Sequence, residues 1–248
     1  MKKENEQSKN QIRERVWKEL RNFAKPDSRF HWDFSSFIPD FDDSQICCNN
    51  IRISREYIDS ETIFITPDNC LDLIRRFAIE DKKKIIISSY GLERDFFYIK
   101  PGSIPLCESK LASTLDGLEL FGKNIKLSEV KAFEKIDLLV TGASMITNNG
   151  LRWGKGHGYF DLEWAMFREI GVCFEETPIF AVIHDCQLVN INPELSKYDT
   201  LVDVIFTPKQ TIKIHNELPK PLKVYWELLT EDQLLKIPAL KELREKFG

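Results

Sequence analysis

The sequence of 248 residues lacks a long apolar run, an export signal and a surplus of positive charge. No apolar stretch approaches the ~20 residues that a transmembrane helix needs. The N-terminal MKKENEQSKN is positively charged, but the apolar core of a signal peptide does not follow it. The net charge of −4 is unlike the surplus of Lys and Arg that binds nucleic-acid backbones. We therefore expect a cytoplasmic protein whose partners include neither membrane nor nucleic acid.

Cysteine pairs at metal-ligand spacing are also absent. The six cysteines form no C-x-x-C pair, which argues against a structural zinc site; they are Cys47, Cys48, Cys70, Cys107, Cys173 and Cys186. We expect reduced thiols that mostly pack as small apolar residues. Apolar residues make up 42% of the chain and charged residues 30%, as in folded globular proteins. The length fits one domain over residues 1–248, with residues 1–8 expected to be flexible.

Hydrophobic periodicity predicts helices and strands in alternation. Residues 10–24 place Ile12, Val16, Leu20 and Phe23 on one helical face. Residues 27–60 show little periodicity and predict loops with one short strand. Further on, the patterns predict strands over 82–89, 136–146, 178–184 and 200–208, and helices over 68–80, 159–171 and 231–247. This alternation predicts an α/β three-layer sandwich with a mostly parallel sheet.

The stretch NNGLRWGKGHGYFDLEWAMF, residues 148–167, holds four glycines within nine positions: Gly150, Gly154, Gly156 and Gly158. In open α/β sheets, ligands bind beyond the carboxyl ends of strands, where a following helix offers free N–H groups. Glycine lets such a backbone approach a phosphate without a Cβ in the way. Arg152 and Lys155 add charged donors, and Asp161 is placed to hold a magnesium ion. The stretch predicts a phosphate-binding loop; the alternative is a flexible connection with solvated charges.

Two common phosphate motifs do not fit this loop. A Walker loop needs G-x-x-x-x-G-K followed by Ser or Thr, but the glycine spacing before Gly154 is one residue short. Gly156 then occupies the hydroxyl position. The dinucleotide fingerprint G-x-G-x-x-G differs from the G-x-G-x-G found here. A different kind of phosphate loop is therefore expected.

GLRWGKGHGYFD resembles the G-x-R-x-G-x-G-x-G-Y-Y-D signature of the 5-formyltetrahydrofolate cyclo-ligase family, also called 5,10-methenyltetrahydrofolate synthetases. Three further stretches resemble the family in the same order: KNQIR near the N-terminus, DLLVTG before the loop, and QLVNINPELSKYDTLVDVIFTP after it. The resemblance implies a fold shared with sugar-phosphate isomerases and CoA transferases. It also implies a ligase that uses ATP and Mg2+ on a reduced folate or related pterin. ATP would phosphorylate the formyl oxygen of 5-formyltetrahydrofolate, and ring closure would release phosphate and give 5,10-methenyltetrahydrofolate.

The resemblance also assigns site residues by position. Arg152, Lys155 and the amides of Gly154, Gly156 and Gly158 would contact the triphosphate. Asp161 would hold Mg2+ directly or through water, and Tyr159 would line the cleft near the pterin. His157 fills a variable position of the signature and would face solvent or phosphate. Arg152, Lys155 and Tyr159 are thus the expected catalytic residues.

More distant residues complete the implied nucleotide site. Lys9 and Arg13, one helical turn apart, would reach the triphosphate from the other side; spacing alone would also fit a solvated helix face. Asp199 and Asp203 match the carboxylates of the later strand, although a structural hydrogen bond suits Asp203 equally well. His184 ends a predicted strand, and with no second histidine at ligand spacing we interpret it as structural.

The chain departs from the family pattern at two positions. The second tyrosine of the signature is Phe160, and the histidine of the later H-D pair is Tyr198. In these features it looks closer to a divergent branch, the methenyltetrahydrofolate-synthetase-domain proteins. Two alternatives to the cyclo-ligase stay open. One is an ATP-dependent enzyme of the same fold on another heterocyclic substrate, and the other is a nucleotide-binding module without turnover.

Overall fold

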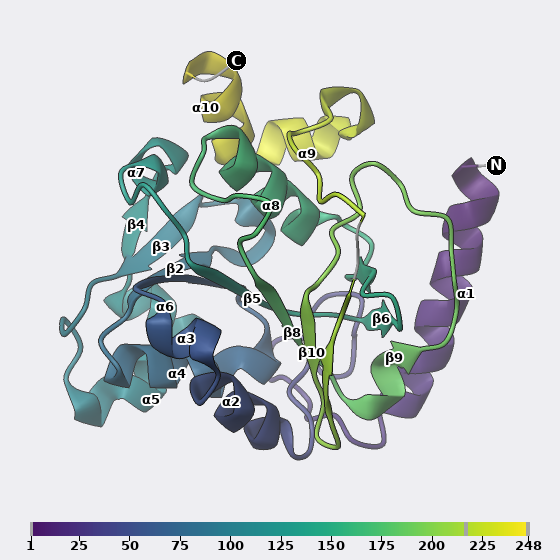
Figure 1. Cartoon of the computed structure of the whole chain (residues 1–248), viewed down its shortest axis with the longest axis horizontal. Helices are drawn as coiled ribbons and strands as arrows, with labels where there is room; N and C mark the ends of the chain where they lie inside the picture. Colours follow the sequence, from purple (N-terminus) through teal and green to yellow (C-terminus); the bar gives the residue numbers. More distant parts are fainter. Residues whose placement is uncertain (1, 216–217, 247–248) are drawn as a thin grey trace.

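The computed structural model describes residues 2–215 and 218–246, with side chains from Lys9 onwards. The described residues form an eight-stranded sheet between two layers of helices, in the order β11-β10-β8-β5-β1-β2-β3-β4 (Figure 1). The strands are β1 (Thr62–Ile65), β2 (Lys84–Ser88), β3 (Phe96–Ile99), β4 (Lys123–Ile125), β5 (Leu138–Gly142), β8 (Ile179–Val182), β10 (Val204–Phe206) and β11 (Thr211–Lys213). Neighbours from β10 to β2 pair in parallel, whereas β11, β3 and β4 pair antiparallel. The predicted α/β architecture with a mostly parallel sheet is confirmed.

Alternation along the strands builds a core on each face of the sheet. Phe64 of β1 and Leu139 of β5 belong to one buried cluster, together with residues of the helix that follows the glycine loop. Their neighbours Ile63 and Leu138 belong to the cluster on the opposite face. Because successive side chains of a strand point to opposite faces, both faces must be apolar when both are covered by helices. This explains the continuous apolar runs in the sequence.

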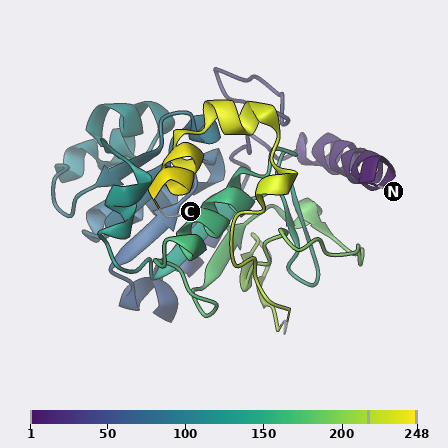
Figure 2. The same ribbon diagram turned by 90° about the horizontal axis from the view of Figure 1, so that it is seen from above.

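Helices cover both faces of the sheet. One face carries α7 (Leu127–Lys131), α8 (Tyr159–Glu169), α9 (Glu231–Lys236) and α10 (Pro238–Lys246) (Figure 1). The other carries α2 (Ser44–Arg52), α3 (Arg55–Asp59), α4 (Asp72–Glu80), α5 (Ser109–Ala112) and α6 (Leu115–Phe121). Helix α1 (Lys2–Leu20) stands at one side of the molecule (Figures 1 and 2). It packs through Val16 against Met145 and Trp153.

The strand predicted over 136–146 is in fact divided. Strand β5 ends at Gly142, and β6 (Met145–Thr147) starts a second, three-stranded sheet with β7 (Arg152–Trp153) and β9 (Leu188–Val189). Strands β6 and β7 form an antiparallel hairpin. The glycine loop therefore follows β7 rather than the central strand, and the hairpin brings it back towards the end of β5.

Two other expectations differ from the structure. Residues 27–60, predicted as loops with one strand, contain α2 and α3. The helix predicted over 231–247 is broken between α9 and α10, at Pro238, which has no N–H to continue the helix. Helix α1 begins at Lys2 and Met1 lies outside the described residues, so the flexibility expected for residues 1–8 stays a prediction.

The strand order creates a topological switch point between β1 and β5. Strand β1 continues through α4 to β2 on one side, and β5 pairs with the other edge of β1. In open α/β sheets, ligands bind in the crevice outside the carboxyl ends of the strands at such a point. Here these ends are Ile65 of β1 and Gly142 of β5. The switch point and the glycine loop therefore lie at the same end of the sheet.

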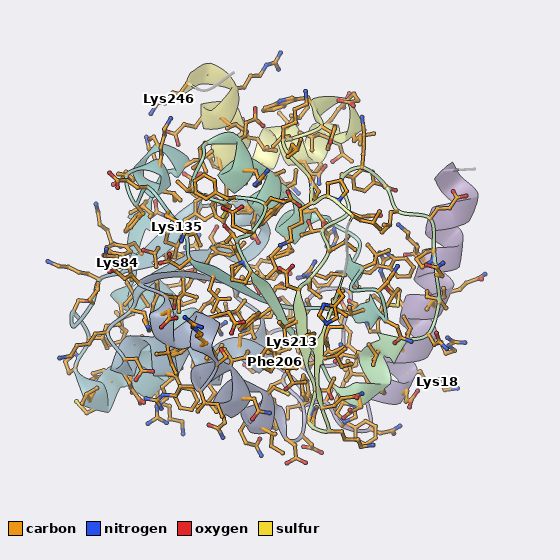
Figure 3. The ribbon with its side chains drawn as sticks, viewed as in Figure 1. Lys18, Lys84, Lys135, Phe206, Lys213 and Lys246 are labelled. Atoms are coloured by element: carbon orange, nitrogen blue, oxygen red, sulfur yellow. The ribbon has the colours of Figure 1, made fainter. Side chains whose placement is uncertain are left out.

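Strand β11 forms one edge of the eight-stranded sheet. Phe206 of β10 and Lys213 of β11 lie close together there, whereas Lys18, Lys84 and Lys246 extend outward from other edges of the molecule (Figure 3). Within the ranges that the structure describes, no helix has both the length and the apolar composition to cross a membrane.

Candidate functional site

Arg152 is the central side chain of the site. It stands on β7, is 6% exposed, and donates a hydrogen bond from Nε to the Gly142 carbonyl at 2.9 Å. Its guanidinium carbon lies 4.6 Å from the centre of the Phe160 ring. In the described part of the chain, its Nη atoms have no hydrogen-bond partner, although they are held in place by the Nε bond and the ring. They are therefore pre-positioned to donate to a ligand.

The glycine loop presents free backbone donors beside this arginine. The amides of Gly154, Gly156 and Gly158 donate to no acceptor among the residues described. Gly158 is the N-cap of α8 in the left-handed conformation (φ 69°), and Gly156 also has positive φ (111°). These conformations favour glycine and turn successive N–H groups towards the start of a helix. Such an arrangement suits an anion.

Helix α1 supplies two cations to the same place. Arg13 is 5% exposed and donates from Nε to the Gly154 carbonyl at 3.0 Å, which ties the helix to the loop. The Lys9 ammonium lies 5.0 Å from the centre of the Trp153 ring and is 7% exposed. Both side chains line a common cavity with Gly156. The structure thus places Lys9 and Arg13 beside the glycine loop, on the side from which α1 was expected to approach it.

Two carboxylates lie opposite these cations. Asp161, in the first turn of α8, accepts a hydrogen bond from the Thr200 amide at 3.0 Å, and Asp199 accepts one from the Ser196 amide at 2.8 Å. Burial raises the pKa of Asp161 to about 6; the charge on Arg152 acts against this rise, and Asp199 adds to it. Asp161 and Asp199 line the same cavity. The effect of Asp199 on the pKa of Asp161 shows that the two acidic groups lie within electrostatic reach.

The cavity formed by these residues measures about 370 Å³, within the range of small-molecule sites. One end is polar and carries Lys9, Arg13, Arg152 and the glycine loop. The other end is made by α8 and the C-terminal segment. Its apolar residues are Leu162, Ala165, Pro221, Val224, Tyr225, Leu228 and Leu229, and the segment also contributes Lys223, Thr230 and Gln233. A ligand with a polyanionic part and a flat apolar part matches this division.

A second, smaller cavity of about 60 Å³ lies at the switch point. It shares Arg152, Gly154, His157 and Gly158 with the first cavity. Lys155 lines only the second cavity; it donates to the Ser36 carbonyl at 3.0 Å and lies 5.1 Å from the centre of the Tyr90 ring. Burial lowers the pKa of Lys155; the charge on Asp68 acts against this, and the neighbouring Arg152 adds to it. The arginine and the loop therefore stand between two chambers.

Tyr159 also belongs to the second cavity rather than the first. Its ring stacks on that of His157, with the ring centres 5.4 Å apart. Burial lowers the pKa of His157 and raises that of Tyr159, so both are neutral near pH 7. Most of the predicted site residues are thus brought together, but they are divided between two chambers.

Several residues of the second cavity were not predicted from the sequence, among them Asp68, Ser88 and Glu163. Asp68 follows β1 and accepts hydrogen bonds from the Gly142 amide at 2.9 Å and the Thr66 hydroxyl at 2.5 Å. Glu163, on α8, is 3% exposed, and its Oε2 has no hydrogen-bond partner in the described ranges. Burial raises the pKa of Glu163 to about 8, against the smaller effects of Ser88 and Arg152. A lone acid inside the apolar run LEWAMF was the signal for it.

Two residues predicted for the site, Gly150 and Asp203, lie outside both cavities. Gly150 (φ 85°) forms the turn of the β6–β7 hairpin, where a Cβ would come within 2.8 Å of the Val202 carbonyl oxygen. Asp203 accepts from the Ile179 amide and from Lys220 Nζ, both at 2.7 Å, at the amino ends of β8 and β10. That is the end of the sheet opposite to the site. We therefore correct the binding role expected for Gly150, which has a structural position in the hairpin turn. The contacts of Asp203 are those of the structural hydrogen-bonding alternative.

His184 agrees with its structural interpretation. Its ring stacks on Phe23 with centres 4.2 Å apart, and its Nδ1 accepts from the Cys186 amide at 3.3 Å. The described residues contain no cluster of three or more His, Cys, Asp or Glu side chains that could hold a metal ion. A magnesium ion bound with a nucleotide typically uses one or two carboxylates plus phosphate oxygens. Asp161 and Asp199 fit that donor set.

The comparisons with known proteins identify the family of the chain. The model of the 5-formyltetrahydrofolate cyclo-ligase family matches residues 5–208. Methenyltetrahydrofolate synthase domain-containing proteins are 31% identical over 241 residues in Danio rerio and 32% identical over 248 residues in Homo sapiens. These matches cover 94% and 96% of this chain but 60% and 62% of the relatives, so the chain spans less than two thirds of their length.

A solved structure shows the same fold. The NMR structure of Aquifex aeolicus 5,10-methenyltetrahydrofolate synthetase superposes with a TM-score of 0.52 and 14% identity, over 89% of this chain and 99% of that one. At this identity the likeness concerns the fold alone. Because the family model covers most of the sequence, including the glycine loop, the chain belongs to the 5-formyltetrahydrofolate cyclo-ligase family.

Proposed function

We propose that the protein is an ATP- and Mg2+-dependent cyclo-ligase that converts 5-formyltetrahydrofolate to 5,10-methenyltetrahydrofolate. The observation that carries the proposal is the position of Arg152 between the two cavities, with both Nη atoms available. A phosphoryl group that moves from one chamber to the other would remain within reach of this guanidinium. Family membership supports the reaction class.

The triphosphate of ATP would occupy the polar end of the first cavity. Arg13 and Lys9 would approach it from α1, and the amides of Gly154, Gly156 and Gly158 from the loop. The γ-phosphate would lie at the boundary that both cavities share, where Arg152 and Lys155 would neutralise it. Asp161 and Asp199 would hold Mg2+, which would screen the phosphate charges.

The substrate would enter from the second cavity. This chamber shares Ser88, Ser89 and Tyr90 with a third cavity of about 300 Å³, which Phe30 and Phe97 also line. Phe30 stacks on Tyr90 with ring centres 5.3 Å apart. An aromatic chamber of this size suits a pterin, while the 60 Å³ chamber would take its formyl group. The carboxyl of Glu163, protonated at neutral pH, would offer a hydrogen-bond donor there.

In this arrangement the protein acts by positioning and charge neutralisation. The formyl oxygen attacks the γ-phosphorus and ADP leaves. The second nitrogen of the substrate then attacks the formyl carbon and loses its proton to solvent. Finally, the C–O bond breaks and inorganic phosphate departs with the former formyl oxygen. Arg152 and Lys155 stabilise the phosphoryl group throughout, which is where the largest electrostatic contribution is needed.

The test is to mix the purified protein with ATP, Mg2+ and 5-formyltetrahydrofolate and to record the near-ultraviolet absorbance of the methenyl product. A rise that requires ATP and disappears in Arg152→Ala supports the proposal. A flat trace from protein that still binds ATP would exclude this substrate and favour another heterocycle. A flat trace from protein that does not bind ATP would contradict the proposal altogether.

A further inference from the structure

The apolar end of the first cavity is built partly by α8 and partly by a segment beyond the part of the chain that the family model matches. That match ends at residue 208, whereas Pro221, Val224, Tyr225, Leu228 and Leu229 line the cavity. The segment thus adds a wall to a site whose phosphate-binding half lies within the matched range. It crosses beside α8 and continues into the helices drawn in yellow (Figure 2).

Hydrogen bonds hold this wall in place at its start. Trp164 Nε1, buried on α8, donates to the Pro221 carbonyl at 2.8 Å, and the Val224 amide donates to Glu169 at 3.0 Å. Two successive turns of α8 therefore fix residues 221–224. Between them Leu222 points away and is 60% exposed. The segment has one face towards the cavity and one towards solvent.

The far end of the wall is tied to the glycine loop itself. Gln233 Nε2, on α9, donates to the His157 carbonyl at 2.9 Å. Tyr225, in the middle, packs beneath the Lys197 ammonium, which lies 4.3 Å from its ring centre. Because the wall is anchored at both ends, it is ordered before any ligand binds. Ligand binding therefore does not have to offset the entropic cost of ordering this segment.

We infer that residues 221–229 form the recognition surface for the nucleobase, so that this C-terminal segment gives the phosphate site its preference for a complete nucleotide over a bare polyphosphate. The inference rests on the proposed nucleotide binding and adds the location of the base. The phosphates must lie at the polar end, and the γ-phosphate at the boundary with the second cavity. The remaining volume, bordered by Leu228, Leu229 and Tyr225, is then where the flat base lies.

The experiment is isothermal titration of the whole protein with Mg2+–ATP and, separately, with Mg2+–tripolyphosphate. Leu228→Ala removes part of the wall, and Leu222→Ala is the matched control, since it makes the same change on the solvent side. Leu228→Ala should weaken ATP binding roughly tenfold through lost apolar contact while tripolyphosphate binding is unchanged. Leu222→Ala should alter neither. Tripolyphosphate binding also reports that the variant is folded.

Three results would overturn the inference while leaving phosphate binding intact. In the first, the wild type binds ATP and tripolyphosphate with equal affinity. In the second, Leu228→Ala leaves ATP affinity unchanged, and in the third it weakens the binding of both ligands equally. A wild-type protein that binds neither ligand would remove the proposed nucleotide site as well. A protein that discriminates as expected but forms no methenyl product would refute the cyclo-ligase and keep the base-binding wall.

Discussion

The Nε of Arg152 donates to the carbonyl of Gly142 at 2.9 Å, which joins the β6–β7 hairpin to the end of the central strand β5. On the other side of Gly142, its amide donates to Asp68 at 2.9 Å. One glycine at the switch point therefore fixes both a cation and a carboxylate. A Cβ at this position would come within 3.0 Å of Asp68 Oδ2, Cys70 and Ile38, so the close approach requires glycine.

Arg152→Lys should lower ATP-dependent turnover by roughly 100-fold, because lysine keeps the charge but loses the planar fork of donors. Steady-state rates of methenyl formation would measure it. Arg168→Lys is the control, since Arg168 lies on α8 outside both cavities and should leave the rate unchanged. Retention of more than half of the wild-type rate by Arg152→Lys would contradict the assigned role.

Gly154→Ala should weaken ATP binding with little change in the free energy of unfolding. Its Cβ would lie 3.2 Å from Arg152 Nη1 and would displace the guanidinium. Gly171→Ala should show the reverse, because Gly171 has φ 78° and open space around it. The left-handed conformation costs alanine about 1–2 kcal/mol, while the site is untouched. Titration calorimetry and denaturant unfolding of both variants separate the two effects, and similar profiles would argue against the steric explanation.

Asp161→Asn should raise the Mg2+ concentration needed for half-maximal activity at least about tenfold, because it removes one of two carboxylates that suit the ion. Asp203→Asn should leave that concentration unchanged. It should instead destabilise the fold by about 1–3 kcal/mol through loss of its charged hydrogen bond with Lys220. Magnesium titrations of activity, with thermal unfolding alongside, measure both. An unchanged requirement in Asp161→Asn would exclude a metal role.

Glu163→Gln should flatten the pH dependence of stability. Burial raises the pKa of Glu163 from 4.5 to about 8, so between these values the folded protein holds a proton that the unfolded chain has released. The free energy of unfolding therefore falls as the pH rises through this window, by at most ~5 kcal/mol. Glutamine cannot ionise and lacks this loss. Denaturant unfolding of both proteins at pH 5 and pH 8 tests it, and parallel curves would show that Glu163 is not protonated in the fold.

Elements with a clear local sequence pattern were predicted from the sequence. The glycine loop, the start of α8 at Tyr159 and the apolar strands β2, β8 and β10 follow from glycine spacing and β-branched runs. Helix α2 was missed because it is only nine residues long and has no side-chain cap at Asp43. With so short a segment, tertiary packing rather than periodicity determines the helix.

The residues missed in the site depend on long-range contacts. Asp68 and Gly142 are 74 positions apart in the chain and meet only because β1 and β5 are neighbours in the sheet. The division after β5 was also missed. Residues 136–146 look like one continuous apolar strand, although β5 and β6 belong to different sheets. Lys155 and Arg152 are three positions apart and were assigned together, yet Lys155 faces only the second chamber. Strand order, which local patterns do not encode, decides these placements.

The most direct test of the account follows the formyl oxygen. The protein would be given ATP, Mg2+ and 5-formyltetrahydrofolate labelled with 18O in the formyl group, and the phosphate released would be analysed by mass spectrometry. Transfer of phosphoryl to that oxygen predicts one 18O atom in each phosphate formed, matched to each methenyl product. Unlabelled phosphate, as from attack of water on ATP, would contradict the account even if ATP were consumed.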